Sequence, residues 1–295
     1  MSDRSAGPTE GKHIFSVDLE EYFQVHAFDG IVEREEWDII PSRVETPTGR
    51  LLDLLERTGN RATFFALGWV ADRHPDLLRR ISDAGHEVAS HGYGHKRLTE
   101  MTPDEFRADL QRSRLSLESA TGKPVFGYRA PTFSLVPGTE WAFDILIEEG
   151  FAYDSSLFPI RRAGYGFAGA KPDVHEIQRA GGRILEIPMT TTVVAGIRLP
   201  AAGGGWFRQL PYGLTRSGFR RCQRMGNPGM FYIHPWELDP DQPRIPVPFL
   251  QRVRHYRGLQ RIESRLERLL SDFSFTSAQE RFQLGDQRAD REAMA

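Results

Sequence analysis

Two histidines separated by three residues are the sharpest chemical signal in the sequence. His91 and His95 lie in the segment Ser90-His91-Gly92-Tyr93-Gly94-His95. Glycine permits tight turns, and such a turn can direct both imidazoles at one metal ion. Two surface histidines would show the same pattern, so a metal site also requires a carboxylate from another part of the chain.

Acidic residues that could supply this carboxylate follow an apolar segment near the N-terminus. Asp18 and Glu20 come directly after Phe15-Ser16-Val17, and alternate residues of an extended chain point to the same side. One carboxylate could bind the metal while the other acts as a base. Acidic residues at the start of a helix are the alternative interpretation.

An arginine and a third histidine complete the set of reactive residues. Arg129, in Tyr128-Arg129-Ala130-Pro131, could hold a carboxylate ionised and oriented through paired hydrogen bonds. A structural ion pair would serve equally well as an explanation. His234 lies between the apolar residues 230–233 and Pro235, which suits a proton donor or a histidine of the core.

These residues need a scaffold that brings distant parts of the chain together. Apolar segments typical of strands alternate with segments of helical periodicity, and glycines follow four of the helical segments closely. We expect strands at residues 13–17, 63–67, 87–90, 125–128, 151–153, 183–187 and 230–233, and helices at 49–57, 76–84, 103–120 and 139–149. Repeated strand–helix–strand units predict a parallel sheet, either a barrel or an open doubly wound sheet.

Polar residues lie at or just after the C-terminal ends of six of the seven expected strands. They are Asp18, His91, Arg129, Asp154, Glu186 and His234. In a parallel α/β barrel all these strand ends open on one face, where active sites are built, so the pattern predicts an enzyme. Residues 160–182 and 196–213 are expected to form long loops, and residues 249–270 one amphipathic helix.

Composition excludes several other classes of function. The net charge of −2 and a charged fraction of 26% provide no field that would attract nucleic acid. Cys222 is the only cysteine, so an intrachain disulfide is excluded. No apolar run approaches the roughly 20 residues of a membrane helix, and residues 1–12 do not resemble a signal peptide. We therefore expect a cytoplasmic protein without an integral membrane segment.

Taken together and in this order, the four motifs resemble the polysaccharide deacetylases of carbohydrate esterase family 4. Residues 16–25, 203–208 and 231–244 look like the narrower group of exosortase-associated exopolysaccharide deacetylases. The resemblance implies an α/β fold, a distorted (β/α) barrel with about seven parallel strands and a C-terminal helical extension. It implies a hydrolase that removes acetyl groups from the N-acetylated sugars of an exopolysaccharide or its lipid-linked precursor.

The resemblance also implies a role for each motif. Glu20, His91 and His95 would bind a divalent metal, usually zinc in this family, and Asp18 would be the catalytic base. The family's adjacent aspartate pair is replaced by Asp18-Leu19-Glu20, which leaves open whether Asp18 or Glu20 is the metal carboxylate. Arg129 would orient the base.

The remaining roles concern the leaving group and the substrate. His234 would protonate the departing amine, and the family's acidic partner of this histidine is not obvious, so Asp154 and Glu186 are the candidates. A backbone N–H of Thr132 or Phe133 would stabilise the oxyanion. Trp206 and its neighbour Phe207 could pack on a sugar ring.

We expect one barrel domain over residues 13–284, including a C-terminal extension from about residue 240. Residues 1–12 and 285–295 are expected to be flexible. Two other functions stay open, an allantoinase-like hydrolase of cyclic amides and an inactive barrel that binds a glycan. The sequence does not indicate an oligomeric state.

Overall fold

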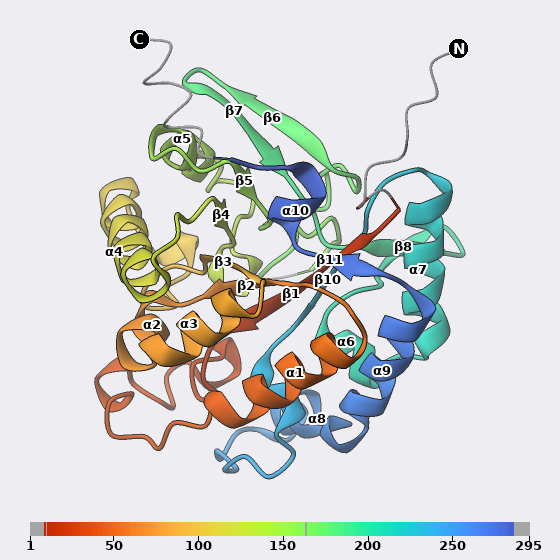
Figure 1. The fold of residues 1–295 in the computed structure, drawn as a ribbon, viewed down its shortest axis with the longest axis horizontal. Helices are drawn as coiled ribbons and strands as arrows, with labels where there is room; N and C mark the ends of the chain where they lie inside the picture. Colours follow the sequence, from red (N-terminus) through yellow and green to blue (C-terminus); the bar gives the residue numbers. More distant parts are fainter. Residues whose placement is uncertain (1–8, 10, 163, 286–295) are drawn as a thin grey trace.

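The computed structural model describes residues 9, 11–162 and 164–285. The flexible ends expected at residues 1–12 and 285–295 therefore lie almost wholly outside the described residues. In the described part, helices surround a central group of strands (Figure 1).

Seven parallel strands form the centre of the molecule, in the spatial order β10-β1-β2-β3-β4-β5-β7. Their bounds are β1 (His13–Leu19), β2 (Thr63–Ala66), β3 (Glu87–Ser90), β4 (Gly127–Tyr128), β5 (Tyr153–Asp154), β7 (Gly182–Glu186) and β10 (Met230–Ile233). All seven coincide with expected strands, so the α/β fold with about seven parallel strands is confirmed.

The sheet is a barrel that does not close. No ladder joins β7 to β10 within the described residues, and the N–H of Thr190 donates to the carbonyl of Met230 across this gap at 3.3 Å. Short additional strands extend the sheet: β6 (His175–Arg179) pairs antiparallel with β7, and β11 (Phe275–Thr276) pairs parallel with β1. A separate hairpin consists of β8 (Thr191–Val194) and β9 (Ile197–Pro200).

The helices cover the strands and are delimited by local signals in the sequence. Their bounds are α1 (Glu45–Arg57), α2 (Gly68–Arg73), α3 (Pro75–Asp83), α4 (Pro103–Thr121), α5 (Trp141–Glu148), α6 (Gly204–Gln209), α7 (Tyr212–Arg224), α8 (Phe249–Tyr256), α9 (Ile262–Asp272) and α10 (Ala278–Phe282). In α4, Thr102 caps the first turn by accepting from the N–H of Glu105, and Gly122 ends the helix with φ 66°. Such local signals explain why α1, α3, α4 and α5 could be predicted.

The core is formed by strands that are buried on both faces. Every residue of β1 is buried, and so is every residue of β2, β3 and β10. Strands enclosed by helices on one side and by the barrel interior on the other read as nearly continuous apolar runs. Asp18, Glu20, His91 and His234 are among the polar residues within and just after these runs.

Two expectations about the C-terminal half are wrong. Residues 249–270 do not form one helix, because α8 ends at Tyr256 and α9 begins at Ile262. Gly258 lies between them with φ 82°, and a Cβ there would lie 3.1 Å from the carbonyl oxygen of Arg208. The apolar periodicity continues across a turn whose backbone conformation favours glycine. The loops expected at 160–182 and 196–213 also contain β6, β9 and α6.

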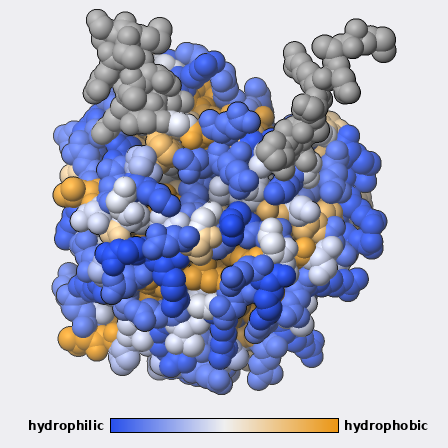
Figure 2. Space-filling view, viewed as in Figure 1, coloured by the Kyte–Doolittle hydropathy of each residue, from blue (hydrophilic) through white to orange (hydrophobic). Residues whose placement is uncertain are grey.

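Polar side chains cover most of the face shown in Figure 2, and the apolar areas on it are small and separate. Among the described helices, none combines the length and apolar character that crossing a bilayer would require.

Candidate active site

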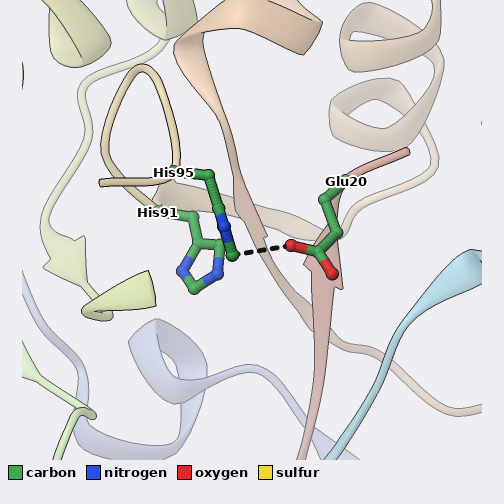
Figure 3. Close-up of side chains that lie close together, drawn as sticks. All are labelled: Glu20, His91 and His95. Atoms are coloured by element: carbon green, nitrogen blue, oxygen red, sulfur yellow. Dashed lines mark ion pairs between the residues drawn. The ribbon is translucent and has the colours of Figure 1, made fainter. Parts of the chain in front are cut away.

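Three buried side chains from two strand ends converge on one point. Glu20 follows β1, and His91 and His95 belong to the loop after β3 (Figure 3). Potential ligand atoms of all three lie within 4.8 Å of one another. Oε2 of Glu20 is 2.9 Å from Nε2 of His95, so the arrangement can close around a single cation.

The loop that carries the histidines is fixed by contacts that require its sequence. Gly92 has φ 76°, and a Cβ there would lie 2.9 Å from Oδ2 of Asp109. Asp109 accepts hydrogen bonds from the N–H groups of Tyr93 at 2.8 Å and Gly94 at 3.3 Å. Because α4 supplies Asp109, the helix and the loop position the two imidazoles together.

The state of His91 suits a metal ligand. Its Nδ1 lies 2.9 Å from the carbonyl of Arg129, which leaves Nε2 to face Glu20 and His95. Burial, together with the neighbouring His95 and Arg129, lowers the pKa of His91 well below its usual value. A neutral imidazole whose other nitrogen is held by a carbonyl is the form that binds zinc. Two imidazoles and a carboxylate thus fit a divalent cation with an open position.

Asp18 lies beside this group and is held by a buried arginine. The guanidinium of Arg129 is fully buried, and its Nη1 donates to Oδ1 of Asp18 at 2.5 Å. The same arginine donates to the hydroxyl of Ser16 at 2.9 Å and to the hydroxyl and carbonyl of Ser155 at 3.0 and 3.1 Å. These bonds fix the orientation of the guanidinium, and the guanidinium fixes that of the carboxylate.

His234 faces both carboxylates from the end of β10. Its Nε2 lies 3.6 Å from Oε1 of Glu20 and 3.9 Å from Oδ2 of Asp18. Its Nδ1 lies 3.0 Å from Oε1 of Glu237. Burial alone would lower the pKa of His234, but Glu20 and Glu237 outweigh it and raise the pKa to about 9. This raised pKa favours the protonated form of the ring.

Glu237 forms a buried ion pair with Arg208. The C-terminal region fixes the position of this arginine. Nε of Arg208, on α6, donates to Oε2 of Glu237 at 2.6 Å, and Nη1 of Arg208 donates to the carbonyls of His255 and Arg257 at 3.0 and 2.6 Å. Although burial opposes it, Arg208 and His234 lower the pKa of Glu237 to about 2. Glu237 thus stays ionised beside the histidine.

A stack of three aromatic rings supports His234 and Glu20. The His234 ring stacks on Trp236 at 5.0 Å between centroids, and Trp236 stacks on His255 at 4.3 Å. The indole N–H of Trp236 donates to Oε1 of Glu20 at 3.3 Å. His255 belongs to α8, so the C-terminal extension contributes to the orientation of His234 and Glu20.

The predicted residues meet at a cavity of about 610 Å³. Those that line it are Asp18, Glu20, His91, His95, Thr132, Phe133, Trp206 and His234. Arg129 lies beneath its floor, in contact with Asp18. Phe207 does not contact this space, because it is buried against Phe231 in the core with 5.1 Å between ring centroids. Of the two neighbouring aromatic residues, only Trp206 is available to a ligand.

The suggested partners of His234 are wrong. Asp154 accepts from the N–H and hydroxyl of Ser156 at 2.9 and 2.6 Å, and Glu186 accepts from the N–H of Leu157 at 3.1 Å. Burial raises the pKa of both carboxyl groups, and the charge of Asp154 raises that of Glu186 further. They form a buried pair that anchors the segment after β5, whereas Glu237 is the neighbour of His234.

Sequence reasoning missed Glu237, Arg208, Trp236 and His255. Glu237 and Trp236 stand within the segment Tyr232–Glu237 that drew attention to His234, and an acidic residue three positions after a histidine was a usable signal. Arg208 and His255 are distant in sequence and carry no such signal.

Comparison with known proteins divides the chain into two matched stretches. Residues 36–139 match the family model described as polysaccharide deacetylase, and residues 155–283 match a domain of unknown function, DUF3473. A peptidoglycan deacetylase-like protein of Gibberella zeae is 36% identical over 111 residues, which cover 37% of this chain and 32% of that protein. The peptidoglycan deacetylase of Helicobacter pylori is 35% identical over 108 residues, which cover 37% of this chain and 36% of that protein.

The chain thus matches these curated relatives over about a third of their length. The crystal structure of a Mycobacterium smegmatis protein assigned as a polysaccharide deacetylase superposes with a TM-score of 0.62 at 21% identity, covering 95% of this chain and 91% of that one. At this identity the likeness concerns the fold. The family model and the curated relatives agree that residues 36–139 are those of a polysaccharide deacetylase domain, and the fold of the chain is consistent with it.

Proposed function

We propose that this protein is a metal-dependent N-deacetylase that hydrolyses the acetamido groups of an exopolysaccharide or of its lipid-linked precursor. The observation that carries the proposal is the convergence of Glu20, His91 and His95 with Asp18 and His234 around one cavity. Amide hydrolysis needs an activated water, a stabilised oxyanion and a protonated leaving group, and this set of residues can supply each.

A divalent cation such as zinc, held by Glu20, His91 and His95, would acidify a water molecule and polarise the acetamide carbonyl. Asp18 would accept the proton of the attacking water. The buried guanidinium of Arg129, 2.5 Å from Oδ1 of Asp18, keeps this carboxylate oriented toward the cavity while its other oxygen stays available.

His234 would donate a proton to the nitrogen of the substrate as the carbon–nitrogen bond breaks. The products are acetate and a free amine on the sugar. The donor must be a cation before the bond breaks, and the ionised Glu237 at 3.0 Å favours this form.

The developing oxyanion needs a donor at the cavity wall. The N–H of Phe133 donates to the carbonyl of Ala130 at 3.0 Å, so we assign the oxyanion donor to the N–H of Thr132. Thr132 has φ 57°. A residue other than glycine adopts this backbone conformation at a cost of about 1–3 kcal/mol, and such residues are typical of functional sites.

We propose that residues 13–284 act as one domain. Strands β1 to β4 precede residue 139 and pair in one sheet with β5, β7 and β10, which follow it. Arg208 and His255, which support His234, also belong to the second matched stretch. Neither stretch holds a complete site alone.

The test is metal content combined with acetate release. We expect about one zinc per chain in the wild type, release of acetate from N-acetylated oligosaccharides, and loss of both in the variant His91→Ala/His95→Ala. The control is His175→Ala, because His175 lies in β6 outside the cavity. Hydrolysis of cyclic amides but not of glycans would contradict the proposal in favour of an allantoinase-like enzyme. Glycan binding without hydrolysis would favour an inactive barrel.

A further inference from the structure

One wall of the cavity takes no part in the proposed reaction. It is formed by the segment around Tyr165, by α6 and by α8, and its members are Arg162, Tyr165, Trp206, Gln209, Gln251 and Arg254. These residues follow different strands and helices in the sequence, yet they face the same space as Asp18 and His234. A substrate held by the catalytic residues would extend along this wall.

The charges on this wall are not neutralised by the protein. The other cavity charges have partners: Asp29 pairs with His26, Glu237 with Arg208, and Asp18 with Arg129. No carboxylate of the described residues lies within ion-pair distance of Arg162 or Arg254. Instead, the guanidinium of Arg162 lies 4.8 Å from the Trp206 ring centroid and 5.0 Å from that of Tyr165.

Both guanidinium groups belong to the same cavity. Arg162 and Arg254 line it together with Tyr165. Nε2 of Gln209 donates to the carbonyl of Arg254 at 3.3 Å and to that of Gly205 at 3.0 Å. This glutamine therefore links α6 to α8 and holds the wall together.

The wall also offers neutral contacts suited to a sugar. The Trp206 ring is half-buried, and an aromatic face packs well on the apolar face of a pyranose. Oε1 of Gln251 is buried and accepts no hydrogen bond from any residue that the structure describes. A buried acceptor without a donor is costly, and a sugar hydroxyl would satisfy it.

We propose that this wall, the arginine subsite of Arg162, Tyr165, Trp206, Gln251 and Arg254, binds an anionic group of the glycan beside the N-acetylated sugar. The inference deepens the proposed function and rests on it. Planar guanidinium groups bind carboxylate or phosphate oxygens in pairs. The substrate is thereby oriented with its acetamide toward His234 and its negative charge toward α8.

The anion could be the carboxylate of a uronic acid or the phosphate of a glycan precursor, and three probes distinguish these sources. Affinities would be measured calorimetrically on the zinc-loaded protein for a hyaluronan tetrasaccharide, for UDP-N-acetylglucosamine and for neutral chitotetraose. We expect at least one charged probe to bind about tenfold more tightly than chitotetraose. The preferred probe identifies the carboxylate or the phosphate as the group recognised.

The variant Arg162→Gln/Arg254→Gln should remove this preference, because glutamine keeps a hydrogen-bond donor and loses the charge. Arg252→Gln is the matched control, since Arg252 lies on the same helix and outside the cavity. Raising the salt concentration from about 50 to about 500 mM should reduce the preference in the wild type and not in the double variant.

Equal affinity for charged and neutral probes would overturn the inference, as would binding of none of them or an unchanged preference in the double variant. Acetate release from chitotetraose without charge preference would leave the deacetylase proposal standing and refute the subsite. Preferential binding of a charged probe without acetate release would support the subsite and refute the reaction.

Discussion

Replacing Glu237 with glutamine should move the pH dependence of catalysis in a defined direction. Glu237 Oε1 lies 3.0 Å from Nδ1 of His234 and helps to raise the pKa of this histidine to about 9. A proton donor with a raised pKa keeps its proton up to a higher pH. Since glutamine removes the negative charge, the pKa of His234 should fall, and activity should be lost from a lower pH upward.

The size of the shift follows from the distance between the charges. Two unit charges about 4 Å apart interact by about 4 kcal/mol at an effective dielectric constant of about 20, and one pKa unit corresponds to about 1.4 kcal/mol. The full charge effect is therefore about three units. Glutamine still offers an oxygen to Nδ1, so we expect the basic limb to move down by about one to three units. A bound cation would offset the effect of Glu20 equally in both proteins, so the difference isolates Glu237.

The assay is kcat/KM for acetate release measured from about pH 5 to about pH 10. Arg208→Gln provides the opposite perturbation, because it removes the cation 2.6 Å from Glu237 and should leave the basic limb in place or move it upward. Each variant leaves one member of a buried pair unpaired, which costs about 3–5 kcal/mol, so thermal unfolding must show that both are folded. A folded Glu237→Gln protein with the basic limb of the wild type would refute the assigned role.

Three further predictions concern the other parts of the site. Asp18→Asn should lower kcat by about 10²- to 10⁴-fold while the zinc content stays that of the wild type; loss of zinc would instead make Asp18 the metal carboxylate. Gly92→Ala should weaken zinc binding and lower the melting temperature, because φ is 76° and the new Cβ would lie 2.9 Å from Asp109; metal titration and thermal unfolding measure this, and unchanged values would contradict it. Trp206→Ala should raise KM for oligosaccharides with little change in kcat, and steady-state kinetics that show the reverse would exclude a binding role.

Local signals explain why so much of the barrel could be predicted. A buried parallel strand needs a short apolar run, and a helix that returns the chain needs periodic apolar residues and a glycine at its end. Gly59, Gly85, Gly122 and Gly150 all have positive φ where the sequence suggests a helix end. The grouping of Asp18, His91 and His234 follows from the rule that parallel strand ends share one face.

The sequence could not predict which residues on that shared face lie close to one another. Asp154 and Glu186 also follow strands, but they bind the backbone at Ser156 and Leu157 and do not reach the cavity. Their place beside His234 is taken by Glu237, three residues along the chain.

The sequence by itself determined the order of strands and helices, because these elements depend on interactions between near neighbours in the chain. It also determined the residue types of the reaction centre. Only the tertiary structure decided which carboxylate partners His234 and which cations remain unpaired. Arg208 donates to Glu237, which lies 29 residues further along the chain, and Arg162 and Arg254 line the same cavity. Hydrogen bonds and ion pairs act over a few ångströms, so residues far apart in sequence acquire their roles only when the fold brings them within that range.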